Sequence, residues 1–113
     1  MALDERGAAV VSDRAHAFDA LFASNLLEAE VRATLARERI TAVPALLDRI
    51  AWVFPDRPLG GEIARVLRAG YLRGPDAWHL ACALLAAESH PGMTFLTLDA
   101  RQRAIAAKLG FAT

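Results

Sequence analysis

The chain has 113 residues, of which 55% are hydrophobic and 23% are charged, and 13 acidic and 13 basic side chains give a net charge of zero. This length fits a single domain over residues 1–113, and the balanced charge argues against a strongly basic, nonspecific nucleic-acid binder. No run approaches the about 18 apolar residues of a membrane span, and the N-terminus lacks the apolar region of a secretory signal, so we expect a cytoplasmic protein without membrane contact.

The first 40 residues of the chain are predicted to contain a helix, a short strand and a second helix. Residues 8–21 can form the first helix, and LFAS at 21–24 has the character of a short strand or turn. Ser24 or Asn25 then caps a helix over residues 25–40, with acids in its first turns and arginines towards its end.

The rest of the chain alternates between helical and strand-like segments. We expect a short helix from Pro44, a strand over 51–54, an amphipathic helix over 59–70, an apolar helix from Pro75 to about Ser89, a strand over 93–98 and a final helix ended by Gly110. This alternation predicts an α/β fold with a small parallel sheet flanked by helices.

Glu30 is the first carboxylate with an unusual position. At the helical period it lies inside the apolar arc of its helix, whereas Glu28 and Arg32 lie outside as an exposed i,i+4 pair. A carboxylate directed towards the core is costly unless something pairs with it. Glu30 is therefore either bonded to an arginine or a backbone group at the edge of the core, or part of a site.

Asp76 and Asp99 lie at element ends, where two interpretations apply to each. Asp76 follows Pro75 in the first helical turn, where a negative charge gains from the helix dipole. Asp99 ends the predicted strand, and with Gln102 it fits a variant of the capping box. Carboxyl ends of parallel strands are also where α/β folds bind ligands, so both acids can instead converge in a site.

Convergent carboxylates would need a cation to offset their repulsion. Mg²⁺ and Mn²⁺ prefer oxygen ligands and commonly join protein carboxylates to phosphate. Spacing alone makes such a site possible at Glu30, Asp76 and Asp99. The single Cys82 excludes an internal disulfide and a cysteine zinc cage, and we interpret it as a small buried hydrophobe.

Other chemistries receive little support from the sequence. His79, one turn after Asp76, is interpreted as a packed or capping histidine rather than a catalytic base. Gly60-Gly61 lacks the lysine and hydroxyl residue of a phosphate-binding loop. The sequence suggests no Ser-His-Asp or Cys-His arrangement.

Three segments together resemble the PIN-domain family, and VapC-type toxin ribonucleases in particular. SNLLEAEVRATL is similar to the segment with the family's second acid, here Glu30. RGPDAWHLACALLAA resembles the family's D-A-x-H-L-A-x-A-L helix and maps the third acid to Asp76. FLTLDARQRAIAAKLGF is similar to its T-x-D strand end, which maps the fourth acid to Asp99 and a site-orienting role to Thr97.

The resemblance implies a three-layer α/β/α fold and an endoribonuclease that depends on Mg²⁺ or Mn²⁺, with Glu30, Asp76 and Asp99 as catalytic metal ligands. It also implies an RNA substrate, an antitoxin partner that covers the site, and a homodimer. Six arginines either contact RNA phosphates or form solvated helix faces: Arg32, Arg37, Arg39, Arg65, Arg68 and Arg73.

The chain departs from the family at its N-terminus. Family members begin with a buried strand that ends in the first aspartate, whereas ALDERGA resembles the loop after that strand. We expect that Asp4 does not replace the absent ligand, because no strand precedes it. The fold is thus expected to be N-terminally shortened, and two alternatives to the nuclease stay open: a catalytically impaired PIN-like module that binds protein or dimerises, and an α/β domain whose acids are only helix caps.

Overall fold

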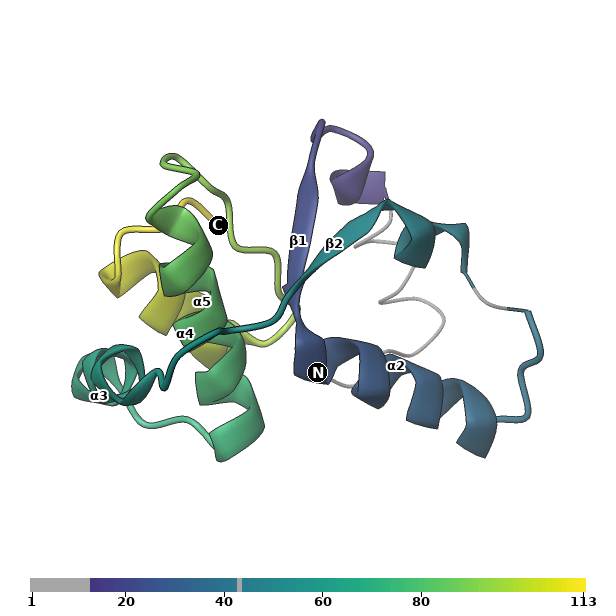
Figure 1. Cartoon of the computed structure of the whole chain (residues 1–113), viewed down its shortest axis with the longest axis horizontal. Coiled ribbons are helices and arrows are strands. Elements are labelled where there is room, and N and C mark those ends of the chain that lie inside the picture. The colour runs from purple at the N-terminus through teal and green to yellow at the C-terminus, as the bar shows by residue number, and fades with distance from the viewer. Residues whose placement is uncertain (1–12, 43) are drawn as a thin grey trace.

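The computed structural model describes residues 13–42 and 44–113. Its elements in chain order are β1 (Leu21–Ser24), α2 (Asn25–Arg37), the 3₁₀ helix η1 (Ala45–Arg49), β2 (Ile50–Val53), α3 (Gly60–Ala69), α4 (Gly74–Ala87) and α5 (Ala100–Lys108). Figure 1 shows α3, α4 and α5 grouped on one side of the two strands and α2 on the other. The α/β class is confirmed.

The sheet consists of β1 and β2, which pair in parallel from Leu21 opposite Ile50 to Ser24 opposite Val53. Parallel neighbours need a crossover connection, and α2 with η1 supplies it. The small parallel sheet that the sequence predicted is confirmed, and both strands begin within one residue of their predicted positions.

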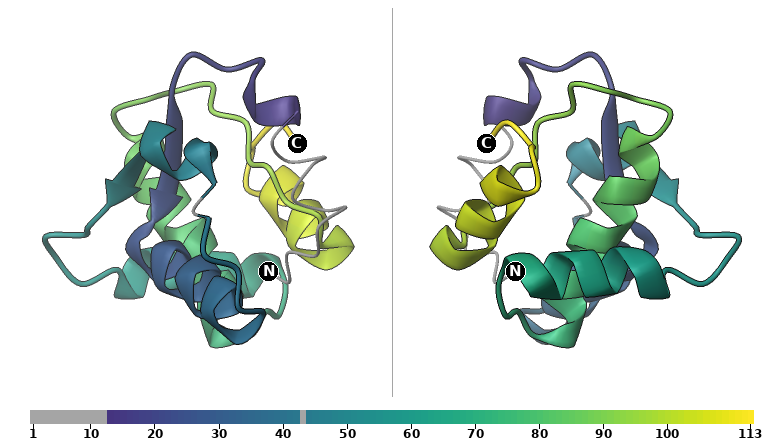
Figure 2. Two further views of the ribbon diagram at one scale, coloured as in Figure 1. Left: turned by 90° about the vertical axis from the view of Figure 1, so that its right-hand side faces the viewer. Right: turned by 90° about the vertical axis from the view of Figure 1, so that its left-hand side faces the viewer.

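The predicted strand over 93–98 is wrong. Within the described residues this segment makes a single parallel bridge, between Thr94 and Ala112. The N–H of Phe95 donates to the carbonyl of Ala112 at 2.8 Å. Figure 2 shows the C-terminal residues returning along the segment that precedes α5. Its threonines and aromatic residue fit a strand, but a ladder needs a neighbouring strand of matching length, and among the described residues this segment pairs with Ala112 alone.

The helix predicted over 8–21 is also mostly wrong within the described residues. Residues 8–12 lie outside the described part, only 13–15 form a helical turn, and β1 already begins at Leu21. The second helix ends at Arg37 rather than residue 40. Arg39 adopts a left-handed φ of 56°, and the N–H of Ile40 donates to the carbonyl of Leu35, which is the hydrogen bond of a Schellman cap.

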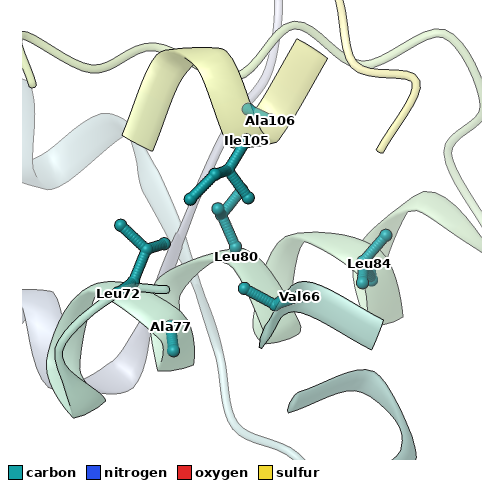
Figure 3. Packing of buried hydrophobic residues seen from close by; sticks show 7 residues of the cluster. All are labelled: Val66, Leu72, Ala77, Leu80, Leu84, Ile105 and Ala106. Atoms are coloured by element: carbon teal, nitrogen blue, oxygen red, sulfur yellow. The ribbon is translucent and has the colours of Figure 1, made fainter. Parts of the chain in front are cut away.

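The helix α5 ends as the sequence predicts, with Gly110 at a φ of 98°. The N–H of Phe111 donates to the carbonyl of Ala106 at 3.1 Å, again in the Schellman pattern. This cap also packs Phe111 against the core, which lies between α3, α4 and α5. Figure 3 shows its buried residues: Val66, Leu72, Ala77, Leu80, Leu84, Ile105 and Ala106.

A smaller cluster connects α4 with the strands. Leu59, Ala81 and Cys82 are buried there, and Val53 of β2 packs against them. The interpretation of Cys82 as a small buried hydrophobe is confirmed, since only 1% of the residue is exposed. Among the described residues, no helix is long and apolar enough to cross a membrane.

Candidate functional site at the start of α4

The buried residue Gln102 connects three of the predicted site residues through its side chain and its backbone. Its Nε2 donates to the backbone carbonyl of Asp76 at 3.2 Å, and its Oε1 accepts a hydrogen bond from the Thr97 hydroxyl at 2.6 Å. Its backbone N–H donates to Oδ1 of Asp99 at 2.8 Å. Because Gln102 lies in the first turn of α5, it fixes the start of that helix against the start of α4.

Asp99 caps α5, and the predicted capping interaction is confirmed for one half of the box. The reciprocal half differs, because the N–H of Asp99 donates to the Thr97 hydroxyl at 3.1 Å instead of to Gln102. Thr97 is 5% exposed and so orients both residues from a buried position. The Thr97 hydroxyl thus donates to the side chain of Gln102 and accepts from the backbone N–H of Asp99.

Glu30 pairs with a histidine rather than with the arginine or backbone group that the sequence suggested. Nε2 of His79 lies 2.6 Å from Oε1 of Glu30, and Nδ1 of His79 lies 2.5 Å from the hydroxyl of Ser24. An ionised carboxylate only accepts hydrogen bonds, so Nε2 of His79 is the donor to Glu30. In the neutral ring, Nδ1 then accepts the hydrogen bond of the Ser24 hydroxyl.

The interpretation of His79 as a packed residue is confirmed, since only 10% of its side chain is exposed, but the sequence did not suggest its two polar partners, Ser24 and Glu30. Ser24 ends β1, Glu30 lies in the second turn of α2, and His79 reaches both from α4. The one signal in the sequence was the position of His79, one helical turn after Asp76 and on the same face. The pairing with Ser24 depends on how α4 packs against β1, and local sequence does not determine that packing.

The exposed pair predicted next to Glu30 is confirmed. Arg32 Nη2 and Glu28 Oε2 lie 3.1 Å apart on the outer face of α2, four residues from each other. This pair is exposed, and its contribution to stability is about 0.3–0.5 kcal/mol. Glu28 is thus a natural comparison for Glu30, being the same residue type on the same helix but directed away from α4.

The predicted acids gather around α4 without forming a metal cage. Glu30 contacts His79, and Asp99 is linked through Gln102 to Asp76, one turn earlier on α4. Carboxylate oxygens suit Mg²⁺ or Mn²⁺ in chemical type. In residues 13–42 and 44–113, however, no group of three histidine, cysteine or acidic side chains lies close enough to hold one ion. The residues as folded do not fit the metal that the resemblance implies.

A cavity of about 550 Å³ lies beside the serine–histidine pair. Its walls are β1, the inner face of α4 and the segment from Pro91 to Leu96. Thr94 and Phe95 of this segment line the cavity, and the N–H of Phe95 is bonded to the carbonyl of Ala112. The cavity therefore has the edge of β1 on one side and an extended main chain on the other.

Comparison with known proteins adds no assignment to these residues. No family model, no curated protein and no solved structure matches this chain. The links that Gln102 and His79 make, together with the cavity beside Ser24, are therefore the features from which a function has to be inferred.

Proposed function

We propose that this chain is a PIN-like endoribonuclease, the toxin of a toxin–antitoxin pair, which hydrolyses RNA phosphodiesters with Mg²⁺ or Mn²⁺. Glu30, Asp76 and Asp99 are its catalytic acids, and Thr97 orients the site. The proposal includes a homodimer and an antitoxin that covers the acids. Its basis in the sequence is the resemblance of three segments, in the order and with the spacing expected of that family.

One observation supports the proposal most directly. Gln102 holds Thr97 and Asp99 against the backbone of Asp76, while His79 holds Glu30 one turn further along α4. Residues that are up to 69 positions apart in the chain, from Glu30 to Asp99, thus gather around two turns of one helix. Caps alone would not require this, because a cap acts within its own helix.

The carboxylates of Glu30 and Asp99 already accept hydrogen bonds within the protein. The carboxylate of Glu30 is bonded to His79, and Oδ1 of Asp99 is bonded to the N–H of Gln102. Each contact competes with a cation for the same oxygen atoms. These hydrogen bonds fix Glu30 and Asp99 in place, and Glu30, Asp76 and Asp99 are the residues that would hold the cation, which would supply positive charge to the phosphate.

The test is Mn²⁺ binding by calorimetry with the 113-residue chain and its Asp76→Asn and Asp99→Asn variants. Asparagine keeps an oxygen for the cap of α5, so Asp99→Asn preserves the fold while it removes the charge. Glu28→Gln is the matched control, because it removes the same charge from an exposed pair on α2. We expect binding to be lost in both aspartate variants and retained in the control.

Two outcomes would count against the nuclease. A parent chain that binds no Mn²⁺ lacks a working site, and equal loss in Glu28→Gln would indicate nonspecific attraction by negative charge. Cleavage of an end-labelled single-stranded RNA, measured with and without EDTA, then decides whether a bound ion supports hydrolysis. The expected result is Mn²⁺-dependent cleavage that Asp76→Asn abolishes.

The cavity favours a second candidate, a catalytically impaired PIN-like module that associates with a second copy of itself. Its apolar walls lie between the edge of β1 and the main chain at Thr94, a geometry that can accept an added strand. Exposed strand edges are common sites of such pairing.

This second candidate has its own test. Ala86 of α4 is half-buried and lines the cavity, so Ala86→Arg would fill the space with a charged side chain. Ala107→Arg, on the exposed face of α5, is the matched control. Sedimentation equilibrium should show a dimer that Ala86→Arg converts to a monomer and Ala107→Arg does not. A monomeric parent, or a dimer that survives Ala86→Arg, would exclude this cavity as the interface.

A further inference from the structure

Two aromatic side chains stand out from the described surface. Phe54 and Tyr71 are each 68% exposed, more than any other large hydrophobic residue among those the structure describes. Phe54 follows β2, and Tyr71 lies in the short connection between α3 and α4. Because the two residues are equally exposed, the charged residues around them decide which one suits an anionic ligand.

Phe54 lies in a neighbourhood whose positive charge is neutralised. Arg57, three residues away, pairs with Glu62 at 2.9 Å and with Glu88 at 3.5 Å. The hydrogen bond and the charge of Glu62 raise the pKa of Arg57 further above its ordinary value. The positive charge of Arg57 is thus offset by two carboxylates, so it would attract an RNA phosphate near Phe54 only weakly.

Tyr71 lies among arginines that have no such partner. Nε of Arg101 donates to the backbone carbonyl of Tyr71 at 2.7 Å, and Arg73 is the N-terminal capping position of α4. In the described part of the chain, no ion pair with a carboxylate involves Arg68, Arg73 or Arg101. The exposed Tyr71 thus has one arginine bonded to its backbone, and two further arginines lie within three residues of it in the chain.

The connection that contains Tyr71 adjoins the candidate site. Arg101 comes two residues after Asp99 in the first turn of α5, and Arg73 comes three residues before Asp76. Gln102 fixes these two helix starts together. The Arg101–Tyr71 hydrogen bond attaches the connection that carries Tyr71 to the same pair of helix starts.

We propose that Tyr71 is a stacking platform for an unpaired RNA base, with Arg73 and Arg101 contacting the phosphates on either side of it. The inference rests on the proposed function, and it adds a residue, Tyr71, that would contact an unpaired base of the RNA substrate. A base in a duplex is already stacked on its neighbours. An exposed aromatic ring therefore stacks with an unpaired base, which is not held between neighbouring base pairs. Arginines contribute sequence-independent attraction to phosphate.

The test is fluorescence anisotropy in EDTA with a labelled single-stranded RNA and with the duplex of the same sequence. EDTA prevents metal-dependent cleavage, so binding is measured separately from the nuclease activity. Tyr71→Ala should weaken binding of the single strand about 5- to 100-fold and leave duplex binding almost unchanged. Tyr71→Phe keeps the ring and should bind like the parent. Phe54→Ala is the matched control and should also bind like the parent.

The Arg73→Gln variant tests the proposed phosphate contact independently of the stacking on Tyr71. It should weaken both RNA forms and reduce the slope of log affinity against log salt by about 0.7 for the single strand, the value for one phosphate contact. A parent that binds no single-stranded RNA would overturn the inference. So would unchanged binding by Tyr71→Ala, or an equal loss in Phe54→Ala or on the duplex. If RNA binding depends on Tyr71 but no Mn²⁺-dependent cleavage occurs, the proposed nuclease activity is wrong and the proposed stacking on Tyr71 is retained.

Discussion

The two sides of α4 differ in how they are held. Towards α3 and α5, α4 packs through apolar side chains, and Val66, Leu80 and Ala106 have no exposed surface. Towards β1 and α2, its contacts include polar ones: Trp78 Nε1 donates to Oδ1 of Asn25 at 3.1 Å, and His79 contacts Ser24 and Glu30. We call the first side the helical half and the second the strand half.

This difference indicates where stability and function reside. Apolar burial supplies most of a domain's stability, at about 25 cal/mol per Å² removed from water. Hydrogen bonds contribute less in net terms but fix direction. The helical half thus provides the rigid support, and the boundary with the strand half places polar groups where they can act. The predicted acids lie along this boundary or at the helix starts beside it.

The largest expected effect tests the difference in packing. Leu80→Ala removes a fully buried side chain from the helical half and should cost about 2–5 kcal/mol of unfolding free energy. Leu21→Ala in β1 is the matched change, and its half-buried side chain lines the cavity. It should cost about 1 kcal/mol, because no closed void is created. Urea unfolding measures both, and equal costs would mean that the cavity is covered in solution.

A second change tests how tightly the helical half is filled. A Cβ on Gly70 would lie 2.8 Å from Cδ1 of Ile105, so Gly70→Ala should cost about 1–3 kcal/mol through overpacking. Cγ1 of Ile105 would lie 2.9 Å from the same Cβ, so Ile105→Ala, which removes both atoms, should recover part of the overpacking cost in the double variant. A double-mutant cycle from urea unfolding measures the coupling. Strict additivity would show that this half has room to adjust.

A third change compares the two helix starts. Asp99 caps α5 with its side chain, whereas Ser24 at the start of α2 makes no side-chain cap and contacts His79 instead. Asp99→Ala should cost about 0.5–2 kcal/mol, and Asp99→Asn should cost much less. Thermal unfolding monitored by circular dichroism provides the comparison. A large loss in Asp99→Asn would show that the charge, rather than the hydrogen bond, holds α5.

The smallest expected effect concerns Cys82, between the two halves. Burial raises the pKa of its thiol to about 11. The folded state therefore retains a proton that the unfolded chain releases at its ordinary, lower pKa, so stability should fall as pH rises from about 8.5 towards 11. Cys82→Ala should lack that component of the decline. Native alkylation by iodoacetamide should be slow at pH 8, and rapid alkylation would show that the strand half opens easily.

Some features of the fold were readable from local sequence because local interactions determine them. The predicted start of α4 at Pro75 agrees with the structure to within one residue, and Gly110 ends α5 in a left-handed conformation. The strand over 93–98 was predicted from composition and is wrong, since pairing requires a partner that composition does not supply. The end of α2 was missed because an arginine, Arg39, occupies the left-handed position that glycine usually takes.

The candidate site also has some features that local sequence determines and others that depend on tertiary packing. The sequence by itself determined the helix starts, the acids Asp76 and Asp99 at them, and Glu30 on the inward side of α2. Only the tertiary structure decided that Gln102 joins the two helix starts and that His79 holds Glu30 and Ser24, which lie 49 and 55 positions away from it in the chain. Caps and helical faces follow from interactions within about four residues, whereas the contacts of a buried polar side chain depend on which elements pack around it.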